Sequence, residues 1–219
     1  ESPGDASIKV FLWGADRQGR DVFSRVVKGA QVSLTIGFFG VLISMVIGSI
    51  VGTASGYFGG WIETVVMRVV DIQLSFPAIL IALVLLAVLG QGIDKIMIAL
   101  VTVQWAYYAR TVRGTALVER RKEYIEAARC LALGDRRIVF RHLLPNCLPP
   151  LIVVNTVLVA SAIALEATLS FLGLGLPITK PSLGLLIANG FGYMLSGKYW
   201  ISFYPGLALL GRLEACAKS

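Results

Sequence analysis

Long stretches without a charged residue constrain this chain more than any other feature of its sequence. A helix that spans a bilayer needs about 20 mostly apolar residues. Five stretches without Asp, Glu, Lys or Arg stand out, and the last is too short to span alone: Gly29–Ile62, Ile72–Ile93, Ile96–Ala109, Leu143–Leu165 and Tyr199–Gly211. The first is densest from Val32 to Ala54, and the third can extend to Val118 if Arg110 and Arg113 reach toward a membrane interface. The pattern predicts an all-α integral membrane protein.

The composition agrees with membrane burial and excludes several other classes. Of the 219 residues, 15% are charged and 56% are hydrophobic, whereas soluble domains carry about 25% charged residues. This hydrophobicity excludes intrinsic disorder, and a water-soluble core of this size could not hide so much apolar surface. Three Cys are too few, and odd in number, for a disulfide scaffold. The net charge of +7 suits nucleic-acid binding only if the basic residues are placed for it.

The basic residues are concentrated in one loop. Nine of the 20 Lys and Arg residues lie around the connection between the third and fourth apolar segments: Arg110, Arg113, Arg120, Arg121, Lys122, Arg129, Arg136, Arg137 and Arg141. Because short cytoplasmic loops are enriched in Lys and Arg, the loop from about 113 to 146 is predicted to be cytoplasmic. Alternation then places residues 57–70 inside and residues 91–95 outside. Topology therefore explains the positive charge, and a nucleic-acid role loses its main support.

These assignments divide the chain into three parts. Residues 1–30 are predicted to be an extracytoplasmic segment, and they lack the apolar core of a signal peptide. Residues 31–211 form the membrane domain. Residues 212–219 are an atypical tail, because the apolar run ends there abruptly.

The cytoplasmic loop has the pattern of a short helix. Residues 119–133 contain no Gly or Pro and favour helix. We expect an apolar stripe, an ion pair between Glu126 and Arg129 on the polar side, and a helix end at Gly134 as a C-cap; the stripe comprises Ile125, Ala128, Leu131 and Ala132. From the pattern alone, a solvated connector and a functional helix both stay open.

Four segments resemble a known family. Glu126-Ala127-Ala128 and the later His142-Leu-Leu-Pro145-Asn146 resemble the EAA loop of the membrane subunits of bacterial ABC importers. Three other segments resemble the branch of dipeptide, oligopeptide and nickel permeases: Gly14–Arg25, Gly56–Trp61 and Leu169–Gly175. The resemblance is collinear over residues 13–210. Four motifs in order on a matching topology are a specific signal, where one would be weak.

The resemblance implies a permease subunit in a bacterial inner membrane. Its fold is expected to be an ABC importer type I permease-like helical bundle, with about five spanning segments, the last truncated and the family's first helix absent. In this family two related membrane subunits form the solute pathway, two cytoplasmic P-loop ATPases drive it, and an extracytoplasmic binding protein delivers the solute. No catalytic residue and no cofactor are expected on this chain, since ATP and Mg²⁺ belong to the ATPases. The lipid bilayer is the remaining partner.

The EAA loop of the family docks in a cleft of the ATPase, which on this sequence implies a defined set of docking residues. They are Glu126, Ala127, Ala128, Arg129, Ala132, Gly134 and Asp135. The chain departs from the family at one of them. The family motif usually has Gly six positions after the Glu, where this chain has Ala132. The helix is therefore expected to run longer or to turn differently.

Polar residues within the apolar segments are candidates for the pathway or its gate. Ionisable groups inside a membrane usually face a cavity or a partner, which singles out Glu166, although an outer-interface position is equally open. Asn155, Thr156, Ser161 and Gln104 are further lining candidates, but such residues also serve as ordinary interhelical hydrogen-bond partners.

Nucleotide and metal sites on this chain are disfavoured. Gly192–Tyr199 nearly matches a P-loop but has Tyr where the Mg²⁺-binding hydroxyl is needed, and no strand precedes it. His142 is the only His, and the three Cys have no ligand spacing. The preferred function is ATP-driven import of di- or oligopeptides. Import of nickel or another small solute is the alternative within the class, and a secondary transporter without an ATPase is the alternative outside it.

Overall fold

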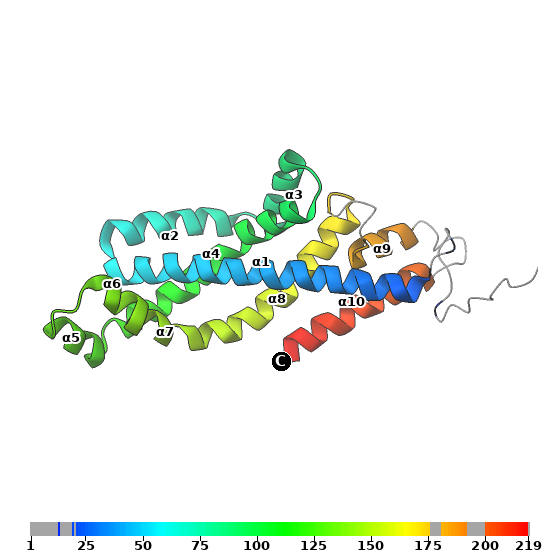
Figure 1. Cartoon of the computed structure of the whole chain (residues 1–219). Helices are drawn as coiled ribbons and strands as arrows, with labels where there is room; N and C mark the ends of the chain where they lie inside the picture. The colour runs from blue at the N-terminus through cyan, green and yellow to red at the C-terminus, as the bar shows by residue number, and fades with distance from the viewer. Residues whose placement is uncertain (1–12, 14–18, 20, 176–180, 192–199, 219) are drawn as a thin grey trace, which may run out of the picture.

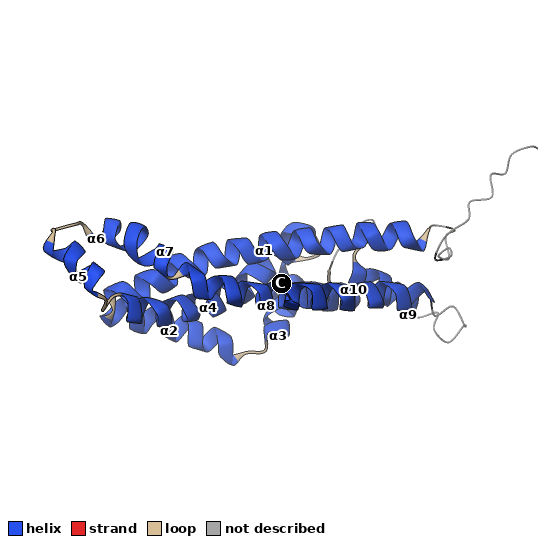
Figure 2. Cartoon of the chain, turned by 90° about the horizontal axis from the view of Figure 1, so that it is seen from below, coloured by secondary structure: helices blue, strands red, loops and turns tan. Residues whose placement is uncertain are grey.

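The chain is helical throughout the part that the computed structural model describes, namely residues 13, 19, 21–175, 181–191 and 200–218. The elements are α1 (Val22–Phe58), α2 (Gly60–Ser75), α3 (Ala78–Leu89), α4 (Ile93–Glu119), α5 (Glu123–Cys130), α6 (Asp135–Arg137), the π-helix η1 (Ile138–Leu143), α7 (Leu144–Asn146), α8 (Leu148–Phe171), α9 (Leu183–Phe191) and α10 (Trp200–Lys218). They form an elongated bundle in both views (Figures 1 and 2). The predicted all-α fold is confirmed.

Helix α1 runs along the length of the molecule. Asp21 caps its start, because its carboxylate accepts hydrogen bonds from the backbone N–H groups of Phe23 and Ser24 at 3.2 and 3.1 Å. The last nine residues of the predicted segment 1–30 are thus the first turns of α1. At the other end the chain reverses through Gly59, whose φ of 67° suits glycine. Helices α5 to α7 lie at this end of α1, whereas α9 lies near its beginning (Figure 1).

Glycines hold α1 directly against α4. A Cβ atom placed on Gly48 would lie 2.5 Å from the Tyr108 Cβ, and one on Gly56 would lie 2.7 Å from the Ala116 Cβ. Between them, a Cβ on Gly52 would lie 2.5 Å from the backbone oxygen of Ala109. These glycines recur every fourth residue and so share one face of α1. The two longest helices therefore pack with their backbones in close approach, as small residues allow in membranes.

The expectation that Ile72–Ile93 forms one helix is wrong. The apolar run is divided between α2 and α3, which meet at an angle of 91°. Pro77 lies at the break, where it has no N–H for a helical bond and restricts the preceding residue to extended backbone; Phe76 accordingly has φ −94° and ψ 142°. Helix α2 also starts earlier than the apolar run, at Gly60.

Helix α4 confirms the extension of the third apolar segment toward Val118. Arg110 and Arg113 form ion pairs with Asp71 and Glu63 of α2. The Arg113 Nε lies 2.8 Å from Glu63 Oε1. These arginines are therefore held by carboxylates of the neighbouring helix in the structure.

Helix α8 lies further along the chain than expected, at Leu148–Phe171 in place of Leu143–Leu165. Proline is favourable in the first turn of a helix, where its missing N–H costs nothing, and Pro149 stands there. Residues 138–147 form η1, α7 and a turn before it. Glu166 consequently lies inside α8 and not at its end.

Helices α9 and α10 complete the described part. A Cβ on Gly184 of α9 would overlap the backbone oxygen of Ala167 in α8, and one on Gly190 would lie 2.6 Å from the Ser202 nitrogen of α10. Helix α10 starts at Trp200 and continues without a break beyond Gly211 to Lys218. The P-loop-like residues 192–199 and most of segment 1–20 lie outside the described residues.

Fewer helices qualify as spans than the five expected. By length and composition, α1 and α8 are apolar enough to cross a membrane in the described part of the chain, and the bent pair α2–α3 makes a third if it counts as one span.

Candidate functional site

The predicted docking residues lie on a short helix at one end of the bundle. Helix α5 has eight residues and is joined to the end of α4 by a three-residue turn. The chain returns to the bundle through α6, η1 and α7, which lead into α8 (Figure 1). The segment 120–146 therefore projects from the same end as the α1–α2 turn.

Helix α5 has a buried side and an exposed side. Ile125 is fully buried and Ala128 is 5% exposed, so these two positions of the predicted stripe are confirmed. The other two are wrong, since Leu131 is 74% exposed and Ala132 is exposed as well. The remaining docking candidates on the helix, Glu126, Ala127 and Arg129, are exposed together with Cys130. We call these four residues the outer face of α5.

The turn after α5 differs from the expected C-cap at Gly134. Ala132 takes the left-handed conformation with φ 52°, the only positive φ of a residue other than glycine in the described part. The Ala132 N–H donates to the Arg129 carbonyl at 2.9 Å, and the Leu133 N–H donates to the Ala128 carbonyl at 3.2 Å. These two bonds are a Schellman motif, which ends the helix at Leu131. Gly134 instead precedes α6 with extended backbone.

This geometry predicts the effect of restoring glycine at the turn. A residue with a Cβ atom pays about 1 kcal/mol in the left-handed region, and glycine does not. We expect Ala132→Gly to slow hydrogen exchange of the amides at positions 132 and 133 by about fivefold. Ala127→Gly, within α5, is the matched control and should speed exchange, because glycine in a helix interior costs about 1 kcal/mol. Equal rates of amide hydrogen exchange in Ala132→Gly and in wild type would show that Ala132 is not strained at this turn.

A buried carboxylate anchors α5 to the end of α4. Glu119 accepts hydrogen bonds from Lys122 Nζ at 2.6 Å and from the Tyr124 hydroxyl at 2.9 Å. The Lys122 bond, followed by the Tyr124 bond, lowers the pKa of Glu119 against the opposing effect of burial. Burial, and then the bond to Glu119, raises the pKa of Tyr124 to about 12. The carboxylate is thus held ionised and the phenol neutral at physiological pH.

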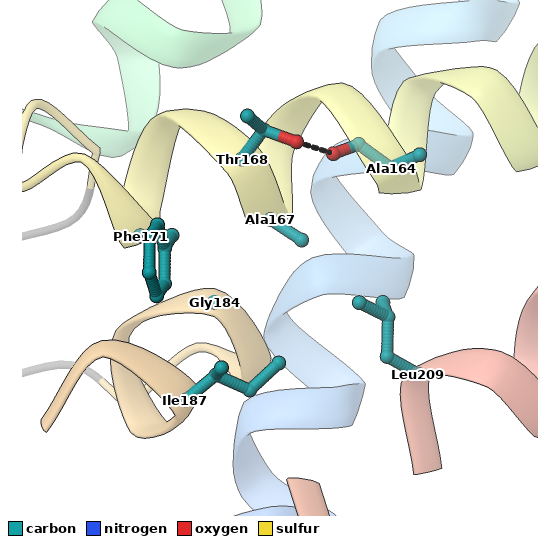
Figure 3. A pocket seen from close by; sticks show the side chains of 7 residues that line it. All are labelled: Ala164, Ala167, Thr168, Phe171, Gly184, Ile187 and Leu209. Atoms are coloured by element: carbon teal, nitrogen blue, oxygen red, sulfur yellow. Dashed lines mark hydrogen bonds between the residues drawn. The ribbon is translucent and has the colours of Figure 1, made fainter. Parts of the chain in front are cut away.

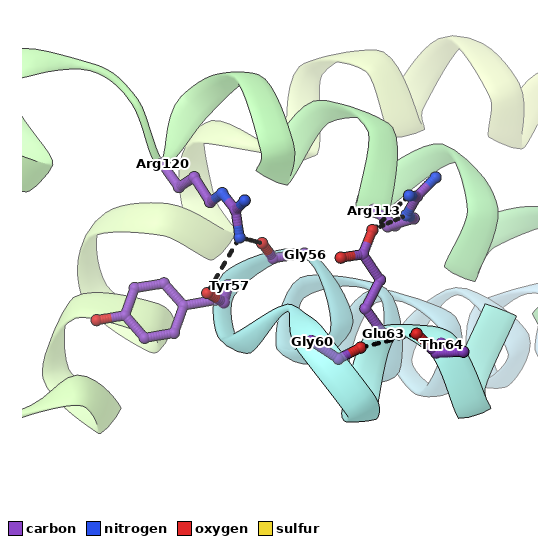
Figure 4. Close-up of polar contacts among 7 residues, drawn as sticks. All are labelled: Gly56, Tyr57, Gly60, Glu63, Thr64, Arg113 and Arg120. Carbon is purple, nitrogen blue, oxygen red and sulfur yellow. Dashed lines mark hydrogen bonds and ion pairs between the residues drawn. The ribbon is translucent and has the colours of Figure 1, made fainter.

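A second anchor joins segment 120–146, which we call the docking segment, to the end of α1. The Tyr57 hydroxyl donates to Asp135 Oδ1 at 2.7 Å, and the Arg129 guanidinium lies over the Tyr57 ring, 5.5 Å from its centroid. Arg129 therefore contacts Tyr57, and the predicted ion pair with Glu126 is wrong. Arg120 Nη1 donates to the Gly56 carbonyl at 2.8 Å (Figure 4). Neither Tyr57 nor Arg120 was predicted from the sequence as part of this site, although Tyr57 lies in the segment Gly56–Trp61 that carries part of the family resemblance.

The structure does not bring the pathway candidates together. Asn155 accepts a hydrogen bond from the Tyr108 hydroxyl at 2.7 Å, and Gln104 Nε2 donates to the Leu158 carbonyl at 3.4 Å; both bonds lie between α4 and α8. Thr156 bonds to the Val153 carbonyl of its own helix at 2.8 Å. Ser161 is exposed. These residues behave as interhelical and intrahelical partners within this chain.

Glu166 lies in a buried cluster with three serines. Its side chain is fully buried, and Oε1 accepts a hydrogen bond from Ser170 Oγ at 2.7 Å. The hydroxyls of Ser33 in α1 and Ser182 at the start of α9 face the same carboxyl. Among the described residues, Glu166 Oε2 and Ser33 Oγ have no partner of full hydrogen-bonding geometry. Glu166 is thus enclosed by residues of its own chain, and its predicted place at the pathway or its gate stays a prediction.

A hollow of about 250 Å³ lies near this cluster, between α8, α9 and α10. Figure 3 shows its wall, which is almost entirely apolar and includes none of the predicted pathway residues: Ala164, Ala167, Thr168, Phe171, Gly184, Ile187 and Leu209. The Thr168 hydroxyl donates a hydrogen bond to the Ala164 carbonyl at 2.7 Å. The hollow therefore offers shape and apolar contact but no free polar group.

No metal site is evident in the described residues, where no three His, Cys, Asp or Glu side chains are grouped as ligands. His142 lies in η1, and its carbonyl accepts a hydrogen bond from Asn146 Nδ2 at 2.7 Å. Cys147 is buried and Cys130 is exposed.

Solved structures share this arrangement of helices. A chain of the MetNI methionine ABC transporter, determined in inward-facing conformations, aligns with a TM-score of 0.71. The alignment covers 89% of this chain and 92% of that chain, at 22% sequence identity. At this identity the likeness shows the fold alone, which this chain shares with a chain of that transporter, and the predicted fold class is confirmed.

Curated relatives share sequence over most of the chain. A Brucella suis protein, named as a permease of a peptide transport system, is 44% identical over 198 residues, which are 90% of this chain and 66% of that protein. The dipeptide transport system permease protein DppC of Haemophilus influenzae is 35% identical over 205 residues, which are 94% of this chain and 69% of that protein. The chain thus spans about two thirds of the length of these relatives. A family model described as "binding-protein-dependent transport system inner membrane component" matches residues 32–210, and the chain belongs to that family.

Proposed function

We propose that this chain is a non-catalytic permease subunit of an ATP-driven importer, and that α5 docks on a cytoplasmic ATPase. The observation that carries the proposal is the outer face of α5. It is exposed at one end of the bundle, while the opposite side of the same helix is buried. The helix is anchored to α4 through Tyr124 and to α1 through Arg129. A short helix held in this way moves with the bundle as a rigid body, which is what transmission of ATP-driven closure requires.

The proposed partners follow from the family to which the chain belongs. They are a homologous permease subunit, two P-loop ATPases that supply ATP and Mg²⁺, and an extracytoplasmic solute-binding protein. The site of action is the bacterial inner membrane. Peptides are the proposed solute, because the relatives from Brucella suis and Haemophilus influenzae are named as permeases of peptide and dipeptide transport systems.

Charge reversal at Glu126 tests the docking. The chain is expressed with a sister permease and candidate ATPase subunits, and the complex is isolated in detergent. We expect Glu126→Lys to lower the amount of ATPase recovered per permease by at least about twofold, since a repulsive charge in an interface costs several kcal/mol. Uptake of labelled dipeptide into reconstituted vesicles should be lost in parallel.

Asp94→Lys is the matched control for this experiment. It makes the same change of charge at an exposed acidic residue in the first turn of α4, at the end of that helix away from α5. Both variants should insert in membranes as wild type does, and Asp94→Lys should keep the ATPase. A Glu126→Lys complex that retains the ATPase and imports normally would contradict the proposal that α5 docks on the ATPase.

A further inference from the structure

The docking segment and α1 are in contact although they are not consecutive in the chain. Helix α5 follows α4 through a short turn, and α8 follows the segment through η1 and α7. Helix α1, in contrast, meets it through contacts between residues far apart in sequence. Tyr57 and Asp135, whose side chains are 2.7 Å apart, are separated by 78 positions.

Tyr57 occupies the centre of these contacts. It lies in the last turn of α1 with only 8% of its surface exposed. Its hydroxyl bonds to Asp135 after α5, and its ring supports the Arg129 guanidinium on α5 itself. One side chain thus contacts the segment both within α5 and beyond the Ala132 turn. We call this set of contacts the Tyr57 joint.

Neighbouring contacts stiffen the α1 side of the joint. Arg120, at the end of α4, bonds to the carbonyls of Gly56 and Tyr57 at 2.8 and 3.5 Å. Glu63, in the first turn of α2, pairs with Arg113 of α4 (Figure 4). The α1–α2 turn is therefore fixed to α4 on one side, so that a displacement of α5 acting on Tyr57 is not absorbed by a loose turn.

The other end of α1 reaches the opposite end of the molecule. There a Cβ on Gly29 would lie 3.1 Å from the Ser182 backbone carbon at the start of α9, and Ser33 faces the Glu166 cluster. Helix α1 has 37 residues without a break between these two regions. Rigid secondary elements of this kind can carry coupling between distant regions of a protein.

We propose that Tyr57 is a positioning residue that makes α1 move with the docking segment, so that ATPase-driven displacement of α5 reaches α9 through α1. The proposal rests on the proposed function, since it takes the ATPase as the source of the displacement. Tyr57 is not a docking residue itself, although it contacts two of them, Arg129 and Asp135. Because Tyr57→Phe keeps both docking side chains on the segment, it should change coupling and leave docking intact.

Tyr57→Phe removes the hydroxyl bond and keeps the ring beneath Arg129. Tyr124→Phe is the matched control, because it removes a tyrosine–carboxylate bond of the same kind from the same segment. That bond joins α5 to Glu119 of α4, to which α5 is already attached by the chain. Only the first variant removes a bond between α1 and the docking segment.

The first measurement does not involve the ATPase. Spin labels on the exposed Cys130 of α5 and on Ile50→Cys, an exposed position of α1, report their mutual distance in the permease pair, with Cys216 replaced by Ser. We expect a narrow distribution of the spin-label distance in wild type and in Tyr124→Phe, and a broad distribution in Tyr57→Phe. An equally narrow distribution in Tyr57→Phe would show that the Tyr57 joint does not hold α1 and the docking segment together.

The second measurement is made on the complete transporter with its ATPase and binding protein. We expect Tyr57→Phe to keep the ATPase and to lower solute imported per ATP hydrolysed by about fivefold, the lower end of typical coupling between distant sites. Tyr124→Phe should couple as wild type does. A broad distance distribution combined with full coupling would overturn the transmission through α1. A wild-type complex that never retains the ATPase overturns the proposed function, and the transmission with it, whereas the distance measurement tests the joint alone.

Discussion

Replacing Gly52 by leucine is expected to leave no stable folded chain, because α1 and α4 can no longer pack. A Cβ on Gly52 lies 2.5 Å from the Ala109 carbonyl oxygen and 2.9 Å from the Val112 Cβ. Neither atom can move away without shifting the backbone of α4. Alanine alone should cost on the order of 3 kcal/mol, at the upper end of the usual penalty for overpacking, and leucine more. The measurement is the fraction of chain that elutes as a folded species in detergent, together with its thermal unfolding.

Gly114→Ala is the matched control for Gly52→Ala. Gly114 is also helical and lies on α4, but it is exposed, and a Cβ atom placed on it would have no neighbouring atom within 4 Å. Alanine there should be neutral or should stabilise by up to about 1 kcal/mol, since it favours helix over glycine. If Gly52→Ala and Gly114→Ala unfold at the same temperature, the close approach of α1 and α4 is refuted.

The positions of the long helices were largely predictable, because runs of apolar residues report burial in lipid or protein directly. The first run became α1 and the third became α4. The failures occurred where a local backbone constraint competes with hydrophobicity. Pro77 divides one apolar run into two helices at 91°, and Pro149 delays the start of α8. Hydropathy does not register that proline lacks the N–H that a helix interior needs, so it marks no helix boundary at either residue.

The candidate site was predictable in place but not in geometry. The basic loop and the Glu126-Ala127-Ala128 motif identified the segment, yet they did not reveal that Ala132 takes a left-handed conformation. That conformation depends on the Schellman bonds, which are favourable enough to hold alanine where glycine is usual. The role of Tyr57 could not be predicted from the sequence for a different reason. Its contacts with Asp135 and Arg129 arise only once α1 and the docking segment meet at one end of the bundle.

Replacing Glu166 by alanine is expected to destabilise the chain by about 3 kcal/mol, because it removes a buried hydrogen-bond partner and leaves a cavity. Ser170 would lose the acceptor that it now has at 2.7 Å. The serines from α1 and from the start of α9 would then face an empty space. Glu166→Gln should remain close to wild type, since the amide oxygen occupies the position of the carboxylate oxygen that Ser170 binds. Thermal unfolding in detergent distinguishes the two variants.

The serine–glutamate cluster and a pathway position for Glu166 make opposite predictions for these variants. If Glu166 lined the route of the solute, alanine would leave stability unchanged and alter uptake or selectivity. The burial of Glu166 between α1, α8 and α9 argues for a structural role in which unfolding is affected first. Thr168→Ala provides the control, because Thr168 lies two residues away on the same helix but is exposed and bonds only to the Ala164 carbonyl of its own helix. It should cost less than about 1 kcal/mol. A Glu166→Ala protein as stable as Thr168→Ala, but with altered uptake, would instead support a position of Glu166 on the route of the solute.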